Sequence, residues 1–344
     1  MSKSASRLHL TANHRRQPLI SQLTASELQV STEALAPDES TKIIDLEGRR
    51  ARVTRMSHGE FSVIALSSDQ DRLKSVSLVR KELELALAAA SSILEATERV
   101  ESRGHRLIHN LRSVTAKTMQ EVFALVQQRE LIGKSPAEQV SYIQKEIAAD
   151  SAAAAQAFVE ILKHQGAQKA EYSAFETLSG GGGALKPERH SVHKVLMNVF
   201  YLFFGDFLKN RVRARVEPTQ EAALFDYDSM HACIYFLVEN ASKYAKPSSK
   251  LLVSTQRSVR EIVITFEMES LFISAAEEEY IFHEGFSGEL ATGQKKNGSG
   301  IGLYLARELT LLNSGTLTVL CRRRPNDAMY SSNAFTLALP LGNL

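Results

Sequence analysis

The segment Gly298-Ser299-Gly300-Ile301-Gly302-Leu303 places glycines at alternate positions directly before an amphipathic stretch. Glycine has no Cβ, so a glycine-rich backbone can approach a phosphate group closely. The first turn of a following helix offers free N–H groups and the positive end of its dipole to an anion. The pattern predicts a phosphate-binding turn. No strand directly precedes it, which disfavours a Rossmann dinucleotide site.

A second group of polar residues lies in the segment Glu239-Asn240-Ala241-Ser242-Lys243-Tyr244. In a helix Glu239 and Lys243 are neighbours on one face, with Asn240 beside them. Such a group can orient a hydroxyl, ligate Mg²⁺ through the amide oxygen and contact phosphate. The alternative is a salt bridge and an exposed amide on the surface. Apolar residues before the group predict a largely buried helix, in which polar groups need partners: Ile234, Phe236, Leu237 and Val238.

Together these segments resemble the ATP-binding domain of histidine kinases, which belongs to the ATPase superfamily shared with gyrase-type proteins. The resemblance covers roughly residues 190–342. It rests on segments in the family's order and spacing: FLVENASKYA as the asparagine box, IFHEGFSG as the phenylalanine box, GSGIGLYLAREL as the second glycine box and AFTLALPL as the last strand. It implies an α/β sandwich of the GHKL type that binds ATP and Mg²⁺.

The resemblance also implies roles for single residues. Asn240 would ligate Mg²⁺, and Glu239 would help to position the reacting groups. Phe282 and Phe286 would pack a lid formed by residues 285–297. The remaining nucleotide contacts would come from the following residues: Lys243, Tyr244, Gly298, Gly300, Gly302 and Leu303.

The first glycine box departs from the family's pattern. Alignment puts Met268 where the family has the Asp that binds the adenine amino group, and Ser270 where it has a Gly. Glu267 or Glu269 would substitute after a shift of register. A lost hydrogen bond to a carboxylate is worth roughly 1.5–3 kcal/mol, or about 10- to 100-fold in affinity. We expect weakened or less adenine-selective binding, with the phosphate and Mg²⁺ contacts retained.

A helical segment upstream resembles the family's histidine box, with His109 as the phosphoacceptor. Leu111 and Arg112 match the pattern, whereas Asn110 replaces the usual acid and Val114 the usual Pro. An imidazole nitrogen is a competent nucleophile when its other nitrogen is held by a neighbour. Asn110 can orient that nitrogen but cannot accept a proton. General-base assistance typically contributes about 10²–10⁴-fold, so we expect slow autophosphorylation.

Two further residues of this segment have alternative interpretations. Ser113 occupies the position at which the family often uses a polar residue for dephosphorylation. His105 lies one turn before His109 on the same face and is the backup acceptor or a surface histidine. A lone helical histidine is usually structural, so the interpretation of His109 depends on the ATP-binding domain downstream.

The histidine segment lies in a long predicted helix. Residues 69–130 contain no proline and only one glycine, Gly104, and their apolar positions recur every three or four residues. After a break at residues 133–136, Ser135 is an N-cap candidate with Glu138 three residues later, and a second helix runs to about Ala170. One hairpin cannot enclose its own apolar stripe, so we expect a homodimer with a four-helix bundle.

The predicted fold class is α+β, with an antiparallel helical hairpin before the α/β ATP-binding domain. Residues 1–68 are expected to be irregular up to about residue 40 and then to form a small meander of two or three strands. In the kinase interpretation the signal would enter through this region. The hairpin spans residues 69–178, and SGGGG begins a linker over residues 179–189. The catalytic domain then occupies residues 190–344, with mixed strands and helices.

Composition excludes several classes of protein. The chain has 344 residues, about right for two domains, and 41 basic against 39 acidic residues. This balance gives no case for a nucleic-acid binder. The cysteines, Cys233 and Cys321, allow no disulfide framework, and a cytoplasmic location is expected. The most apolar stretch, residues 195–208, is shorter than the roughly 20 residues that a membrane span needs.

The preferred interpretation is a soluble, dimeric, ATP-dependent protein-histidine kinase that phosphorylates His109. The phosphoryl group would pass to an Asp of a separate response regulator in two-component signalling. The alternative is a degenerate member of the family, acting as a histidine phosphotransfer intermediate or as an ATP-responsive switch. A purely structural coiled-coil protein ranks last, because it leaves both polar segments of the C-terminal half unexplained.

Overall fold

The computed structural model describes residues 9–14, 17–179, 184–294, 300–321 and 329–341. Contacts between Cα atoms divide the chain into two compact units, Met1–Arg103 and Gly104–Leu344. Among the described residues, no helix combines the length and the apolar character that crossing a membrane requires.

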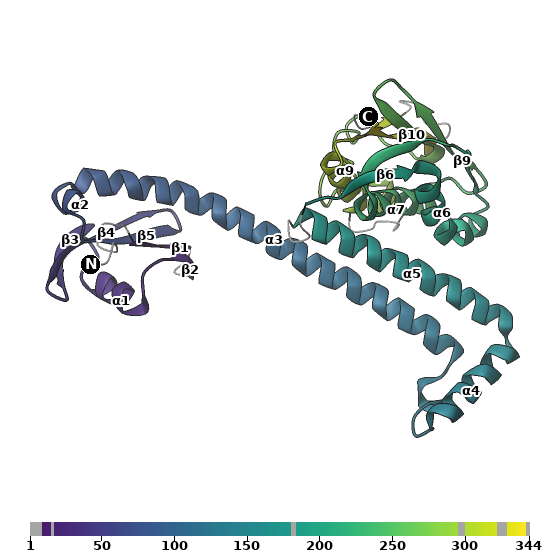
Figure 1. Cartoon of the computed structure of the whole chain (residues 1–344), viewed down its shortest axis with the longest axis horizontal. Helices are drawn as coiled ribbons and strands as arrows, with labels where there is room; N and C mark the ends of the chain where they lie inside the picture. The colour runs from purple at the N-terminus through teal and green to yellow at the C-terminus, as the bar shows by residue number, and fades with distance from the viewer. Residues whose placement is uncertain (1–8, 15–16, 180–183, 295–299, 322–328, 342–344) are drawn as a thin grey trace. The chain divides into compact units, whose positions relative to one another are not determined.

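The first unit contains a five-stranded antiparallel sheet in the order β2-β1-β5-β4-β3 (Figure 1). The three strands expected after residue 40 are present, but the expectation of irregular structure before it was wrong. The described part of that region forms two further strands and a helix, α1, which starts with a Thr24–Glu27 capping box. The elements are β1 (His9–His14), β2 (Gln17–Ser21), α1 (Ala25–Glu33), β3 (Thr41–Leu46), β4 (Arg49–His58) and β5 (Phe61–Ser67).

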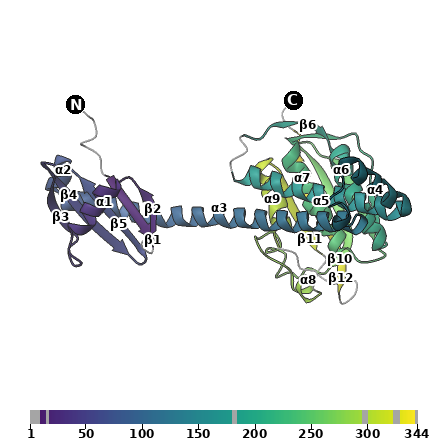
Figure 2. The ribbon, with the colours of Figure 1, turned by 90° about the horizontal axis from the view of Figure 1, so that it is seen from below.

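Helices cover both faces of this sheet (Figure 1), and Figure 2 shows α1 on the face turned to the viewer. One face packs on α1 through a cluster of apolar residues that includes Leu23, Val53 and Leu66. The other packs on the start of α3 (Val76–Leu125) through residues such as Val63 and Leu83. The sheet therefore has two small cores rather than one, and the chain leaves it through α2 (Gln70–Lys74).

The buried Arg52 side chain joins the sheet to the end of α2. It is 8% exposed and donates hydrogen bonds to the backbone oxygens of Arg72 and Leu73 and to Thr41 Oγ1. Carbonyl groups at the end of a helix have no partner within the helix and carry the negative end of its dipole. These carbonyl oxygens therefore stabilise the positive charge of the buried guanidinium group.

The second unit begins with a helical hairpin. The part of α3 after Gly104 runs antiparallel to α5 (Ser151–Leu178), because Asn110 contacts Glu171 while Thr115 contacts Gln168. The predicted second helix is in fact two: α4 (Pro136–Ala149) ends at Asp150, whose side chain caps α5 by accepting from Ala153 N. The Ser135–Glu138 capping box that starts α4 is confirmed.

The rest of the second unit is an α/β sandwich. A five-stranded sheet, β11-β12-β10-β9-β7, is antiparallel except for the parallel pair β7–β9. Three helices bury the apolar side of this sheet: α6 (Val192–Lys209), α7 (Tyr227–Tyr244) and α9 (Gly302–Leu312). The strands are β7 (Arg213–Val216), β9 (Lys250–Arg257), β10 (Glu261–Leu271), β11 (Thr316–Cys321) and β12 (Tyr330–Pro340).

Two short strands of the sandwich were not expected. β6 (Pro187–Ser191) pairs with β8 (Ala222–Asp226), so the expected linker ends in a strand and the expected helix from His190 starts at Val192. β6 is polar and half-exposed, and its partner lies more than 30 residues away. A local pattern carries no signal for such a pair.

Candidate functional site

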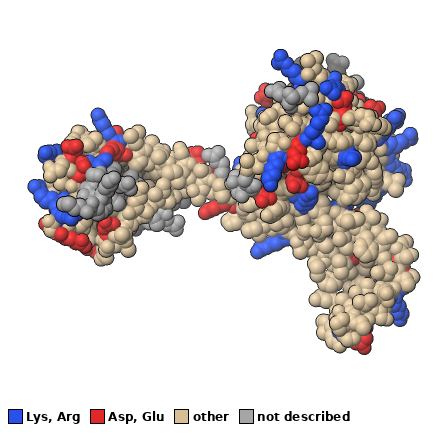
Figure 3. Space-filling model, in the orientation of Figure 1, with Lys and Arg blue, Asp and Glu red and all other residues tan. Residues whose placement is uncertain are grey.

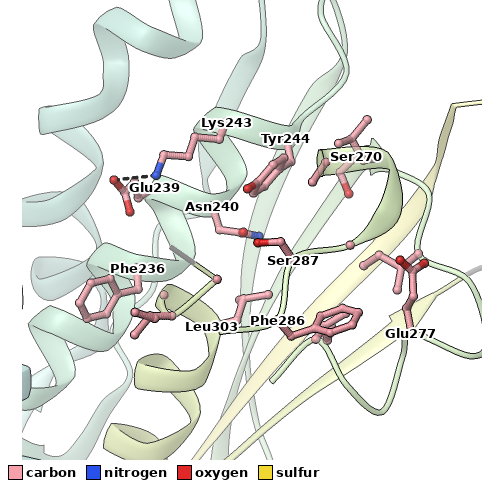
Figure 4. A pocket seen from close by; sticks show the side chains of 18 of the residues that line it. Phe236, Glu239, Asn240, Lys243, Tyr244, Ser270, Glu277, Phe286, Ser287 and Leu303 are labelled. Carbon is pink, nitrogen blue, oxygen red and sulfur yellow. Dashed lines mark ion pairs between the residues drawn. The ribbon is translucent and has the colours of Figure 1, made fainter. Parts of the chain in front are cut away.

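An open cleft lies between α7, the end of β10 and the start of α9 (Figure 4). Its free space, counted out into the open mouth, is about 1040 Å³. Most residues that the sequence assigned to nucleotide binding line it together: Glu239, Asn240, Lys243, Tyr244, Ser270, Gly300, Gly302 and Leu303. The predicted Gly298 lies outside the described residues.

Helix α7 forms the polar wall of the cleft. Asp226 caps it by accepting from Ser229 N at 2.9 Å, and its apolar residues anchor it in the core. This leaves the last turns free to present Glu239, Asn240 and Lys243 at the cleft. Glu239 and Lys243 form an ion pair of 3.0 Å, and Figure 4 shows Asn240 pointing into the cleft. The salt bridge of the alternative interpretation thus exists, and it lines the cleft.

The glycine turn forms the opposite wall. Gly300 has a φ of +68°, and a Cβ there would lie 2.5 Å from the backbone oxygen of Phe286. Gly285 N donates to Gly300 O at 3.1 Å, which ties the turn to the segment after Phe282. Among the described residues, no side chain caps the start of α9 at Ile301. The first turn of α9 therefore keeps N–H groups available for an anion.

The two residues that align with the atypical first glycine box lie in different environments. Ser270 lines the cleft, and its Oγ accepts a hydrogen bond of 2.7 Å from Asn333 Nδ2. Met268 does not line the cleft, because its side chain is packed in the core and is 5% exposed. Glu267 and Glu269 lie on the opposite face of the sheet, since side chains alternate along β10. Neither of them offers the cleft a carboxylate.

The sequence did not single out Asn333 or Glu277 as site residues. Asn333 is 2% exposed and also donates to Leu271 O, so it braces the end of β10. Glu277 lines the cleft, and its carboxylate accepts from the backbone N–H groups of Ser274 and Glu289. These hydrogen bonds lower the pKa of Glu277 against the opposing effect of burial. The contacts of Asn333 join segments that lie far apart in the sequence, and no motif signals them.

Glu171 of α5 also lines the cleft, which the sequence did not predict. Its carboxylate accepts a hydrogen bond of 3.0 Å from Asn110 Nδ2. Burial, with the negative charge of Glu239 nearby, raises the pKa of Glu171 to about 7. Only the packing of the hairpin against the sandwich brings this residue to the cleft.

The histidine segment lies on α3, outside the cleft. His109, Ser113 and His105 are exposed and Asn110 is half-buried, and none of these described residues lines the cleft. Arg106, one turn before Asn110, forms an ion pair with Glu284. The structure therefore brings the predicted nucleotide residues together and leaves the predicted acceptor separate from them.

The donor groups in the cleft fit a magnesium ion. Asn240 offers the cleft an amide oxygen, and Glu239 offers a carboxylate that is ion-paired with Lys243. Hard oxygen donors of this kind suit Mg²⁺. Among the described residues, no group of three or more His, Cys, Asp or Glu side chains gathers at a metal-binding distance. Mg²⁺ bound with a phosphate substrate is commonly held by one or two side chains and the phosphates.

Comparisons with known proteins agree with this geometry. Residues 225–343 match the family described as histidine kinase-, DNA gyrase B-, and HSP90-like ATPase. Similar curated proteins are Histidine kinase P4 of Formosa agariphila, 23% identical over 51% of this chain and 12% of that protein, and the sensor-like histidine kinase SenX3 of Mycobacterium bovis, 28% identical over 36% and 28%. The match thus spans less than a third of the length of either relative.

Solved structures were also found. A mycobacterial sensor histidine kinase, MprB, covers 46% of this chain and 100% of its own at 18% identity, with a TM-score of 0.39. Full-length ShkA, in complex with AMPPNP, covers 72% of this chain and 46% of its own at 14% identity, with a TM-score of 0.43. The cleft and the family match together identify residues 225–343 as a histidine kinase-, gyrase B- and HSP90-like ATPase domain. The chain is a relative of sensor histidine kinases.

Proposed function

We propose that this protein is an ATP-dependent protein-histidine kinase that phosphorylates its own His109. The observation that carries the proposal is the cleft, in which an acid, an amide and a lysine on α7 face a glycine turn at the start of α9. Such a site can bind a magnesium-loaded triphosphate through side chains on one wall and backbone N–H groups on the other. The match of residues 225–343 to an ATPase family supports this assignment.

Different residues of the cleft would contact different parts of the nucleotide. Lys243 offers a cation for phosphate oxygens, and Gly300 and Gly302 let the backbone approach them closely. Tyr244 offers an aromatic face to a nucleobase. Asn240, with Glu239 beside it, would hold Mg²⁺. When bound, this ion neutralises the charge that develops on the phosphate oxygens.

In the proposed reaction an unprotonated imidazole nitrogen of His109 attacks the γ-phosphorus. The bond from that phosphorus to the β,γ-bridging oxygen breaks, ADP leaves, and a P–N bond forms. The second imidazole nitrogen loses its proton to solvent, because Asn110 cannot accept one. Catalysis then depends mainly on positioning. Because His109 lies outside the cleft, transfer requires the sandwich and a hairpin to approach each other, in one chain or across a dimer.

The proposed partners are a second copy of the chain and a response regulator. Large apolar side chains are exposed on the hairpin: Ile108, Met119 and Val122 on α3, Val140 on α4, and Phe158 and Leu162 on α5. Figure 3 shows few charged residues on the viewed face of α4 and of the start of α5. A four-helix bundle would bury such residues. The phosphoryl group would then pass from His109 to an Asp of a receiver protein.

Incubation of the purified protein with γ-labelled ATP and Mg²⁺ tests the proposal. We expect label that is stable in alkali and labile in acid. It should be lost in His109→Gln and in Asn240→Ala, and retained in His105→Gln, which serves as the matched control. Label that persists in His109→Gln would show that another residue is the acceptor.

One observation favours the alternative, a degenerate family member without autokinase activity. Met268 faces the core, and neither neighbouring glutamate faces the cleft, so β10 offers no carboxylate to an adenine amino group. A protein of this kind would give no label from ATP but would accept phosphate at His109 from a phosphorylated partner. The labelling experiment therefore separates the two functions.

A further inference from the structure

We propose that Glu171 is a positioning residue that couples occupancy of the nucleotide cleft to Asn110, the neighbour of the acceptor His109. The inference rests on the proposed function and deepens it by naming a contact between the ATP site and the histidine segment. Glu171 belongs to neither of the motifs that define the two sites. Among the described residues that line the cleft, Glu171 comes from the hairpin and the others come from the sandwich.

The geometry of this contact has two parts. Glu171 is among the residues that line the cleft, whereas Asn110 is not. Asn110 Nδ2 donates to Glu171 Oε1 at 3.0 Å, which holds the amide in one orientation. In the proposed reaction the Asn110 side chain orients the imidazole of His109. A change at Glu171 therefore reaches Asn110 through one hydrogen bond, and it reaches the acceptor through the proposed contact between Asn110 and the imidazole.

Charged groups from two other helices surround Glu171. Glu239 of α7 disfavours its negative charge, while Lys243 of α7 and Arg106 of α3 favour it. The hydrogen bond from Asn110 also favours the charged form, against the effect of burial. The negative charge of Glu171 is thus favoured both by its hydrogen bond from Asn110 and by Lys243, the lysine expected to contact phosphate.

A bound triphosphate would draw on the positive charge of Lys243, which is ion-paired with Glu239 and also favours the charged form of Glu171. Repulsion between the phosphates and the carboxylate would weaken the hold of Glu171 on Asn110. By thermodynamic reciprocity, a change at Asn110 must then alter the affinity for nucleotide by the same factor. This consequence is specific, because Asn110 does not line the cleft.

The test measures two quantities in the full-length protein: the Kd of a fluorescent ATP analogue with Mg²⁺, and the rate of labelling from γ-labelled ATP. Glu171→Ala removes both the charge and the hydrogen-bond acceptor. Glu171→Gln removes the charge but keeps a carbonyl acceptor for Asn110. Glu176→Ala, at an exposed site on α5, is the matched control.

We expect both Glu171 variants to bind the analogue more tightly, by roughly fivefold, the lower end of measured couplings between sites. Labelling should slow by about tenfold in Glu171→Ala, as for a lost charge-assisted hydrogen bond, and Glu171→Gln should restore most of it. Asn110→Ala should tighten binding in the wild type and leave the Kd unchanged in the Glu171→Ala background. Glu176→Ala should change neither quantity.

Three outcomes would overturn the inference. A merely structural role would weaken binding and labelling together in Glu171→Ala. An equal effect of Asn110→Ala on the Kd in both backgrounds would show that no coupling runs through Glu171. Wild-type protein that binds no nucleotide would refute the proposed function and the inference with it. If the wild type binds nucleotide but takes no label, the inference is decided by four Kd values alone: those of the wild type, Glu171→Ala, Asn110→Ala and the double variant.

Discussion

Substitution of Gly300 by alanine tests the close approach that forms the glycine turn. The φ of +68° places Gly300 in the left-handed region, which costs a non-glycine residue about 1–2 kcal/mol. An added Cβ would also lie 2.5 Å from Phe286 O and 2.6 Å from Gly285 C. Both are backbone atoms, so no side-chain rotation relieves the overlap. The total strain is therefore at least about 2 kcal/mol, or roughly 30-fold in an equilibrium constant.

The strain must appear as lower stability, as weaker binding, or as both. If the turn moves, the backbone N–H groups at the start of α9 leave their positions and the Kd of an ATP analogue rises. If it stays, the midpoint of urea unfolding falls. Gly205→Ala is the matched control, because nothing lies within 4 Å of a Cβ at this helical site. An unchanged Kd and an unchanged midpoint in Gly300→Ala would refute the reasoning.

Three further predictions concern buried groups. Met268→Asp should lower the thermal midpoint far more than Met268→Leu, because it places a carboxylate in the core; a gain in ATP affinity without loss of stability would show that position 268 faces the nucleotide. Glu171 has a folded-state pKa of about 7 against an ordinary value of 4.5, so the carboxyl is protonated in the folded chain and ionised in the unfolded chain between these values. Wild-type stability should therefore fall relative to Glu171→Gln as the pH rises from 4.5 to 7, by up to about 3 kcal/mol; parallel urea-denaturation profiles of the two proteins across this range would contradict the assignment. Arg52→Met should lower the urea midpoint of the first unit, since it leaves the backbone oxygens of Arg72 and Leu73 without their donor, whereas Arg50→Met, at an exposed site, should not.

Several features of the molecule could be predicted because a few neighbouring residues decide them. The Ser135–Glu138 capping box starts α4 as expected, since its hydrogen bonds join residues three positions apart. A short segment rich in β-forming residues identified β5, and a strand was also expected at residues 262–267, within β10. The asparagine helix and the glycine turn were located because each is a contiguous segment, and the cleft brings both together.

Other features depend on residues far apart in the chain. β1 was missed because its stability comes from pairing with β5, about fifty residues later, and not from a pattern of its own. The hairpin prediction did not include the break at Asp150, because the apolar stripe continues across it.

The sequence by itself determined which segments carry the polar groups of the nucleotide cleft, because these groups lie at fixed spacings on one helix and one turn. Tertiary structure alone decided which way Met268 faces and that Glu171 reaches the cleft. The physical reason is that a side chain's direction follows from the register of its strand or helix against its neighbours. That register is set by packing over the whole domain and not by the residues beside it.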